Sequence, residues 1–227
     1  MRQEKQIGIK RCFLYGEQNS PHVLIQAIDE HDLEGLDAEY SAILSLTDNE
    51  APLLVAFQID HWNTELSPWC APAVFGKDSF GSGAADTLSY VLNVLIPDME
   101  TVPAEERRYY LGGYSLSGLF SLWAAYQTDR FAGICAASPS VWFPGWMDYV
   151  SSRAIRTPLV YLSLGDREEK TRNQVMSQVG DNIRQQNELL EREPSVRDHT
   201  LEWNKGNHFK DSEFRTAKGF AWLLNHK

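Results

Sequence analysis

The sequence has few of the residues that hold disulfide-rich or zinc-binding domains together. It contains three cysteines (Cys12, Cys70 and Cys135) in 227 residues, an odd number at wide spacing and without a CxxC pair. This pattern predicts neither a disulfide framework nor a zinc site, and we expect reduced, buried thiols. No metal and no organic cofactor is predicted.

Long apolar segments and an excess of cations are also missing. No stretch approaches the roughly 18 apolar residues that a membrane-spanning helix needs, and the charged N-terminal segment lacks the apolar core of a signal peptide. Lys and Arg total 21 against 31 Asp and Glu, which gives a formal net charge of −10. This composition predicts a soluble cytoplasmic protein and argues against nucleic-acid or membrane partners. A small-molecule substrate and homo-oligomerisation stay open.

Repeats, low-complexity tracts and linker-like segments are absent as well, so we expect one domain over residues 1–227. Apolar runs of strand length alternate with segments of helical period, which predicts an α/β fold with a mostly parallel central sheet and helices on both faces. An irregular stretch near 61–80, rich in Trp, Pro and Gly, is predicted to line a pocket. We expect strands at 22–29, 52–60, 107–114, 132–137, 159–164 and 200–203, and helices at 36–46, 84–96, 117–127, 171–190 and 213–225.

The most informative segment joins the strand at 107–114 to the helix behind it with almost no loop. Its sequence places Gly113 two residues before Ser115, and Ser117 and Gly118 follow closely. A nucleophile elbow needs such small flanks, because the serine backbone is strained and the chain folds back tightly. The pattern GxSxS therefore indicates a catalytic serine at Ser115 and an α/β-hydrolase fold. The alternative is a Gly-rich turn in which the serine only caps the helix.

An acid and a histidine follow in the order that this fold requires. A carboxylate cluster comes directly after the strand at 159–164, and His208 lies in a loop before the last helix. Among the acids, Glu168 stands three residues after Gly165, the usual place of the acid in a Ser-His-acid triad of this fold. Asp166 and Glu169 remain alternatives for the triad acid.

Five motifs in the same order resemble the esterase family of α/β-hydrolases that contains enterochelin (siderophore) esterases, feruloyl esterases and S-formylglutathione hydrolases. They are HVLIQAID (22–29), NTELSPW (63–69), the Gly-rich helix start and "IP" stop of 81–100, GDRE (165–168) and GNHF (206–209). Two positions depart from the family pattern. Glu30 follows Asp29 where many relatives have glycine, and Asn63 stands near the place of an arginine in several siderophore-esterase relatives.

The resemblance implies a serine esterase that works through an acyl-enzyme on Ser115. His208 would act as base, Glu168 would orient it, and the amide of Leu116 with that of Glu30 or His31 would form the oxyanion hole. Aromatic residues would line the pocket for a hydrophobic part of the substrate: Trp62, Trp69, Trp142, Phe143 and Trp146. A thioesterase or acyltransferase with the same triad, or a non-catalytic binding protein on the same fold, are the alternatives.

Overall fold

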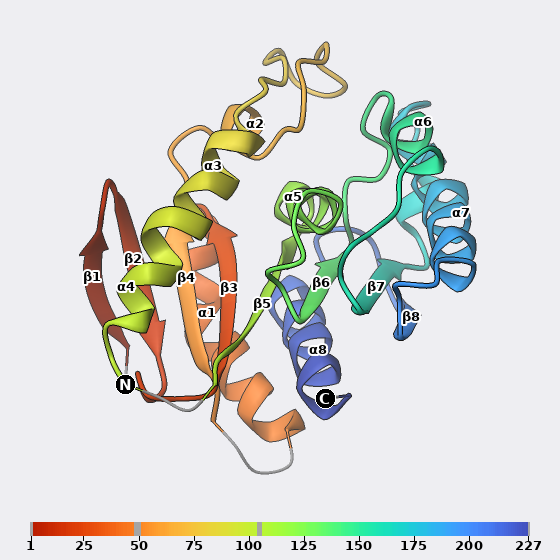
Figure 1. The fold of residues 1–227 in the computed structure, drawn as a ribbon. Coiled ribbons are helices and arrows are strands. Elements are labelled where there is room, and N and C mark those ends of the chain that lie inside the picture. The colour runs from red at the N-terminus through yellow and green to blue at the C-terminus, as the bar shows by residue number, and fades with distance from the viewer. Residues whose placement is uncertain (1, 48–50, 104–105, 227) are drawn as a thin grey trace.

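The computed structural model describes residues 2–47, 51–103 and 106–226, and its strands form one sheet of eight. The order across the sheet is β1-β2-β4-β3-β5-β6-β7-β8 (Figure 1). The pairs β1–β2 and β2–β4 are antiparallel and all the others are parallel. The strands are β1 (Gln3–Ile7), β2 (Lys10–Tyr15), β3 (His22–Ile28), β4 (Leu53–Gln58), β5 (Arg108–Tyr114), β6 (Gly133–Ala137), β7 (Leu159–Gly165) and β8 (Asp198–Asn204).

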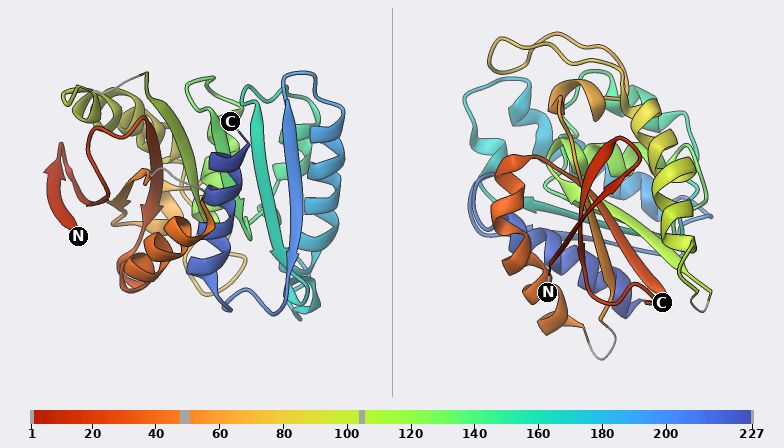
Figure 2. Two further views of the ribbon diagram at one scale, coloured as in Figure 1. Left: turned by 90° about the horizontal axis from the view of Figure 1, so that it is seen from below. Right: turned by 90° about the vertical axis from the view of Figure 1, so that its left-hand side faces the viewer.

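Helices cover both faces of this sheet, as the alternating apolar pattern predicts (Figures 1 and 2). One face carries α1 and α8, which lie side by side, and the other carries α3, α5 and α7. The helices are α1 (Glu30–Leu46), α2 (Trp62–Glu65), α3 (Ala84–Tyr90), α4 (Ile96–Glu100), α5 (Leu116–Ala125), α6 (Trp146–Ser151), α7 (Val179–Glu191) and α8 (Ser212–Asn225). A π-helical segment, Val91–Leu95, joins α3 to α4.

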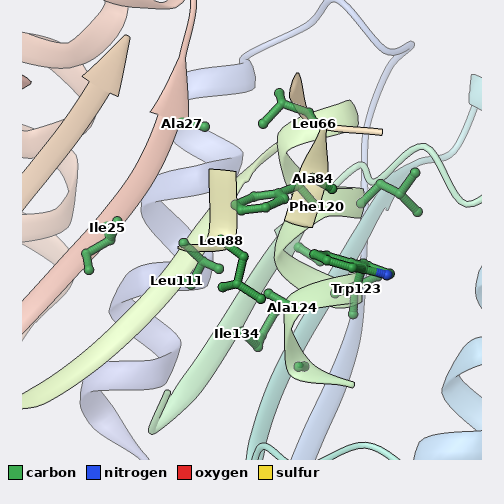
Figure 3. Close-up of a cluster of buried hydrophobic side chains, with 14 of the residues drawn as sticks. Ile25, Ala27, Leu66, Ala84, Leu88, Leu111, Phe120, Trp123, Ala124 and Ile134 are labelled. Atoms are coloured by element: carbon green, nitrogen blue, oxygen red, sulfur yellow. The ribbon is translucent and has the colours of Figure 1, made fainter. Parts of the chain in front are cut away.

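The core on the α3–α5 face explains why β5 and α5 are so apolar. Every residue of α5 is buried, and its aromatic side chains pack against aliphatic side chains of β3, β5 and β6 (Figure 3). Because β5 lies between β3 and β6, the turn that follows it sits in the middle of the sheet's carboxyl edge. Ligands of α/β sheets bind at this edge.

All six expected strands are present within a few residues, but three features differ from the expectation. The first helix begins at Glu30 instead of near residue 36, because the Asp29 carboxylate caps it. The helix expected over 171–190 begins only at Val179, because the Asn173 side chain accepts from the amides of Val175 and Met176 and forms a turn there. The hairpin of β1 and β2 was not predicted, since β1 is mostly exposed and carries no clear apolar pattern.

Two further properties bear on the predictions from composition. Cys12 and Cys135 are buried free thiols, whereas Cys70 is exposed, which corrects the expectation that all three are buried. In the part of the chain that the structure describes, we find no helix that combines the length and the hydropathy needed to cross a bilayer.

Candidate active site

Ser115 lies on a strained turn between β5 and α5. Its backbone has φ 57° and ψ −120°, a conformation that side-chain-bearing residues rarely adopt. The Ser115 amide donates to the Ala137 carbonyl (3.1 Å), which ties the turn to the end of β6. The serine is half-buried, with its hydroxyl at the carboxyl edge of the sheet. This is the local geometry that the sequence pattern predicts for a nucleophile elbow.

Small residues flank the turn because there is no space for side chains. A Cβ atom on Gly113 would lie 2.0 Å from the Ser117 hydroxyl oxygen, and one on Gly118 would lie 3.0 Å from the Gly113 carbonyl oxygen. Ser117 itself is buried and donates its hydroxyl hydrogen to the Ala27 carbonyl (2.9 Å). It is therefore a structural residue of the elbow, and Ser115 is the serine that remains accessible.

We expect Gly113→Ala to destabilise the protein by about 3 kcal/mol, because the added methyl group overlaps Ser117 and cannot move without shifting the turn. Urea unfolding would measure the loss. Ser117→Gly combined with Gly113→Ala should recover part of it, and Ser117→Gly alone is the control. A single Gly113→Ala variant as stable as wild type would contradict this account of the elbow.

Three side chains from different strand ends meet at this turn. His208 Nε2 lies 3.0 Å from Ser115 Oγ, and His208 Nδ1 lies 2.7 Å from Glu168 Oε2. The histidine is partly exposed, whereas the glutamate side chain is only 5% exposed. Serine, imidazole and carboxylate thus form one continuous hydrogen-bonded chain, with the imidazole in the middle.

Glu168 is held in its ionised form at the end of β7. Burial raises the pKa of its carboxyl, but hydrogen bonds from His208, the Gly165 amide (2.7 Å) and the Ser138 hydroxyl (2.8 Å) outweigh burial, so the pKa is lowered from its ordinary value. A Cβ on Gly165 would lie 2.9 Å from Glu168 Oε1, so glycine is needed beside the carboxylate.

The two alternative acids do not contact His208. Asp166 is exposed, and its carboxylate accepts from the Gly206 amide (2.9 Å), a bond that lowers its pKa. Glu169 forms an ion pair with Arg184 on α7 at 2.9 Å. Among the three acids of this loop, Glu168 is the one that the structure brings to the imidazole.

Arg215 on α8 connects the acid to the histidine loop, and sequence reasoning missed it. Its side chain is only 2% exposed, and Nη1 donates to Glu168 Oε1 (3.0 Å) and to the Tyr114 hydroxyl (3.0 Å). Nη2 donates to the carbonyl oxygens of Lys205 (3.3 Å) and Asn207 (3.0 Å), directly before His208. The one signal in the sequence is an arginine among small and apolar residues on the last helix.

Tyr114 completes this support, because its hydroxyl donates to the His208 carbonyl oxygen (2.8 Å) while it accepts from Arg215. Burial, followed by the nearby Glu168 carboxylate, raises the pKa of Tyr114 to about 12, so the hydroxyl keeps its proton at neutral pH. The histidine loop is therefore fixed to the strand that carries Ser115.

A small cavity of about 30 Å³ adjoins Ser115. Of the five aromatic residues predicted to line a pocket, Trp62 and Trp142 do so. Phe75 and Phe80, from the irregular stretch near 61–80, add two aromatic rings that were not predicted as pocket residues. The remaining lining residues are Asn63, Leu116 and Ser140, and the Ser140 hydroxyl lies 3.4 Å from that of Ser115.

The other three predicted pocket aromatics pack behind this wall. Trp69 donates from its indole nitrogen to the Pro144 carbonyl (2.8 Å) and packs edge-on against Phe143, which in turn packs against Phe80. Trp146 is fully buried, and its indole nitrogen donates to Gln186 (3.1 Å). Assigning Trp146 to the pocket wall was therefore wrong, because it belongs to the core between α6 and α7.

The predicted oxyanion donors are only partly available. Leu116 is the first residue of α5, where backbone amides have no partner within the helix. The prediction that the His31 amide is an oxyanion donor is wrong, because this amide already donates to the Asp29 carboxylate (2.8 Å) in the N-terminal cap of α1. Within the described residues, the Glu30 amide has no such bond.

No protein-family model matches the sequence, and no curated protein matches it. Solved structures do match over almost the whole chain. An IroE-like serine hydrolase from Shewanella oneidensis is 14% identical with a TM-score of 0.83, and the match covers 99% of this chain and 80% of that one. The siderophore hydrolase EstA from Aspergillus nidulans is 17% identical with a TM-score of 0.73, covering 100% and 94%.

A third match is the enterobactin esterase FES from Shigella flexneri, at 15% identity and a TM-score of 0.69, covering 100% of this chain and 60% of that one. These similarities and the strand order define the class: the protein has an α/β-hydrolase fold. Its structural neighbours are serine hydrolases and siderophore esterases, the same group of enzymes that the sequence motifs resemble.

Proposed function

We propose that the protein is a serine esterase that hydrolyses a carboxylic ester through an acyl-enzyme on Ser115. The observation that supports this most is the hydrogen-bonded chain from Ser115 Oγ through His208 to Glu168, with distances of 3.0 and 2.7 Å. A nucleophile at its free pKa is weak, and an adjacent base activates it. The strained turn, the histidine and the carboxylate together supply that activation.

His208 Nε2 takes the proton of the Ser115 hydroxyl as the oxygen attacks the ester carbonyl carbon, and then gives it to the leaving alcohol. Glu168 holds the opposite nitrogen and stabilises the imidazolium while the proton is on the ring. Water then attacks the acyl-enzyme, with His208 again as base. This releases the acid and restores the serine.

The Leu116 amide is the first donor to the oxyanion of the tetrahedral intermediate, because it follows the nucleophile at the start of α5. We assign the second donor to the Glu30 amide, since the His31 amide is already used by Asp29. In this class of site, the loss of one donor costs about 3 kcal/mol of barrier.

The substrate we propose is a small-molecule ester with a hydrophobic acyl or aryl part. The aromatic rings of Trp62, Phe75, Phe80 and Trp142 beside Ser115 support this class. Neighbours of the same fold are named as siderophore hydrolases and an enterobactin esterase, so esters of that kind are the natural ones to assay first. Asn63 in this cavity gives the substrate a neutral polar contact.

A fluorophosphonate probe tests the proposal directly, because it reacts with serines that a neighbouring base has activated. We expect one adduct, on Ser115, located by mass spectrometry of the digested protein. The adduct should be lost in Ser115→Ala and its formation should slow by at least about a thousandfold in His208→Ala. Ser140→Ala is the matched control, since that hydroxyl lies in the same cavity and should not be needed for labelling.

Labelling and turnover together separate the proposal from its alternatives. A folded wild-type protein that takes up no probe would favour a binding protein on the hydrolase fold. Release of p-nitrophenol and free acid in equal amounts from p-nitrophenyl butyrate, with neither rate changed by added alcohols or thiols, would identify water as the acyl acceptor.

A further inference from the structure

A second and larger cavity lies on the opposite face of the sheet from α5. It has a volume of about 270 Å³ and sits between α1 and α8, which Figure 2 shows side by side. Gly113 and Tyr114, the two residues before Ser115, form part of its wall. The proposed mechanism does not use this cavity.

The wall of this cavity is strongly acidic. Asp32, Glu34 and Glu39 reach it from α1 and Glu213 from α8, and His31 is the one basic residue beside them. Among the described residues that line the cavity, there is no lysine or arginine. Four acidic residues therefore line one partly open cavity without a permanent cation to balance them.

Two buried polar atoms, in residues that line this cavity, have no hydrogen-bond partner among the described residues. They are Oε1 of Gln26 on β3 and Oε1 of Glu39 on α1, in side chains that are 3% and 5% exposed. An unpaired buried acceptor costs free energy, and a buried carboxylate without a counter-charge costs considerably more. The Gln26 atom is an acceptor, and the Glu39 carboxyl accepts at both oxygens when it is ionised, so a cation that favours the ionised form and brings N–H donors satisfies both.

The pKa values of two carboxyl groups at this cavity also bear on the charge of its ligand. Burial, with the nearby Asp32 and Glu213 carboxylates, raises the pKa of Glu39 well above its ordinary value. A side-chain hydrogen bond with Gln26 opposes this rise. Burial, and then Asp29, raises the pKa of Asp32 to about 6. A positive charge inside the cavity would stabilise the ionised form of both carboxyl groups.

The distribution of the acids does not suit a directly coordinated metal ion. The described residues contain no group of three or more His, Cys, Asp or Glu side chains placed to hold one. Carboxylates must lie within about 2.6 Å of a bound calcium ion, whereas this cavity is large enough for a group of several heavy atoms. A cation that carries its charge on N–H donors matches acceptors spread around such a volume.

We propose that the α1–α8 cavity binds a small organic cation through N–H donors of a primary ammonium or guanidinium group, with Glu39 as its main ionic partner. Gln26 Oε1 accepts a second hydrogen bond, and Glu213 and Glu34 draw the cation in. This site is distinct from the cavity beside Ser115, and the proposal stands whether or not the protein is an esterase.

Isothermal titration calorimetry of the 227-residue chain at about pH 8 tests this proposal. The ligands are propylammonium and methylguanidinium chloride, with tetramethylammonium and sodium chloride at the same ionic strength as controls. We expect saturable binding of the first two only, since tetramethylammonium has the charge but no N–H donors. Affinity should fall at least about tenfold in Glu39→Gln, which keeps the shape but removes the charge.

Glu188→Gln, an exposed acid on α7 outside the cavity, is the matched control and should bind like wild type. Gln26→Leu gives a second readout, because it removes one acceptor without touching the charge and should also weaken binding. Affinity should decrease from about pH 8 to about pH 5, because Asp32, whose pKa is raised to about 6, takes up a proton and no longer attracts the cation. Equal binding of tetramethylammonium, unchanged affinity in Glu39→Gln, or no binding to wild type would each overturn the proposal.

Discussion

Glu168→Gln is expected to lower kcat about 10⁴-fold while leaving the fold intact. The amide is nearly the same shape as the carboxylate, but it cannot hold the imidazole in the required tautomer or stabilise the imidazolium as a carboxylate does. Because Glu168 Oε2 lies 2.7 Å from His208 Nδ1, the exchange changes this contact directly. Steady-state hydrolysis of p-nitrophenyl acetate and butyrate would measure the loss.

The neighbouring acids supply the controls for this variant. Asp166→Asn removes a carboxylate that binds the Gly206 amide, and Glu169→Gln removes the partner of Arg184, so both should keep kcat within a few-fold of wild type. The assignment would be wrong if Glu168→Gln kept near-normal turnover while the loss of either neighbour abolished it. Circular dichroism on all three variants checks that the comparison concerns folded proteins.

The elbow could be predicted from the sequence because its constraints are local. The turn at Ser115 requires small flanking residues and a helix that follows a strand without a loop. Both requirements can be recognised in a short segment of the sequence. The order of serine, acid and histidine is equally visible, since each follows an apolar strand. For the same reason, Glu168 could be preferred over its neighbours by its position after Gly165 alone.

The oxyanion loop was predicted less well because a single side chain decides its geometry. The sequence pattern predicts no helix before residue 36, but the Asp29 carboxylate accepts from the amides of His31 and Asp32. The Asp32 carboxylate accepts in return from the Asp29 amide. This capping box starts the helix at once. It uses the His31 amide and leaves Glu30 as the remaining donor of that segment.

Contacts between distant segments that no sequence motif marks could not be predicted. Trp146 and Trp142 stand in similar sequence surroundings. Trp146, however, lies in the core and donates to Gln186, whereas Trp142 lines the cavity beside Ser115. Arg215 lies 47 positions from Glu168, and its role depends on how α8 packs against the ends of β5 and β7. Such roles follow from packing of the complete sheet, which local patterns do not encode.

Arg215→Met is expected to lower the free energy of unfolding by about 3–5 kcal/mol at neutral pH. In this variant the buried Glu168 carboxylate loses its ion pair with the guanidinium. The carbonyl oxygens of Lys205 and Asn207 lose the hydrogen bonds that they accept from Arg215. Urea unfolding measures the loss. Arg215→Lys should recover only part of the stability, because an ammonium group cannot reach all five acceptors of the guanidinium. These are Glu168, the Tyr114 and Ser138 hydroxyls, and the carbonyl oxygens of Lys205 and Asn207.

The pH dependence of this loss separates charge from positioning. Glu168 has a lowered pKa, so its ionised form contributes stability that is complete above its ordinary pKa of 4.5 and is lost as pH falls through the lower value in the folded protein. The difference in stability between wild type and Arg215→Met should therefore shrink below about pH 4, as the carboxylate that Arg215 pairs with is neutralised. The part that persists at low pH measures the bonds to the histidine loop.

In turnover assays, loosening this loop should lower kcat more than it raises KM, because His208 contacts the reacting serine and not the bulk of the substrate. A loss of stability independent of pH, with kcat unchanged, would show that Arg215 only fills space.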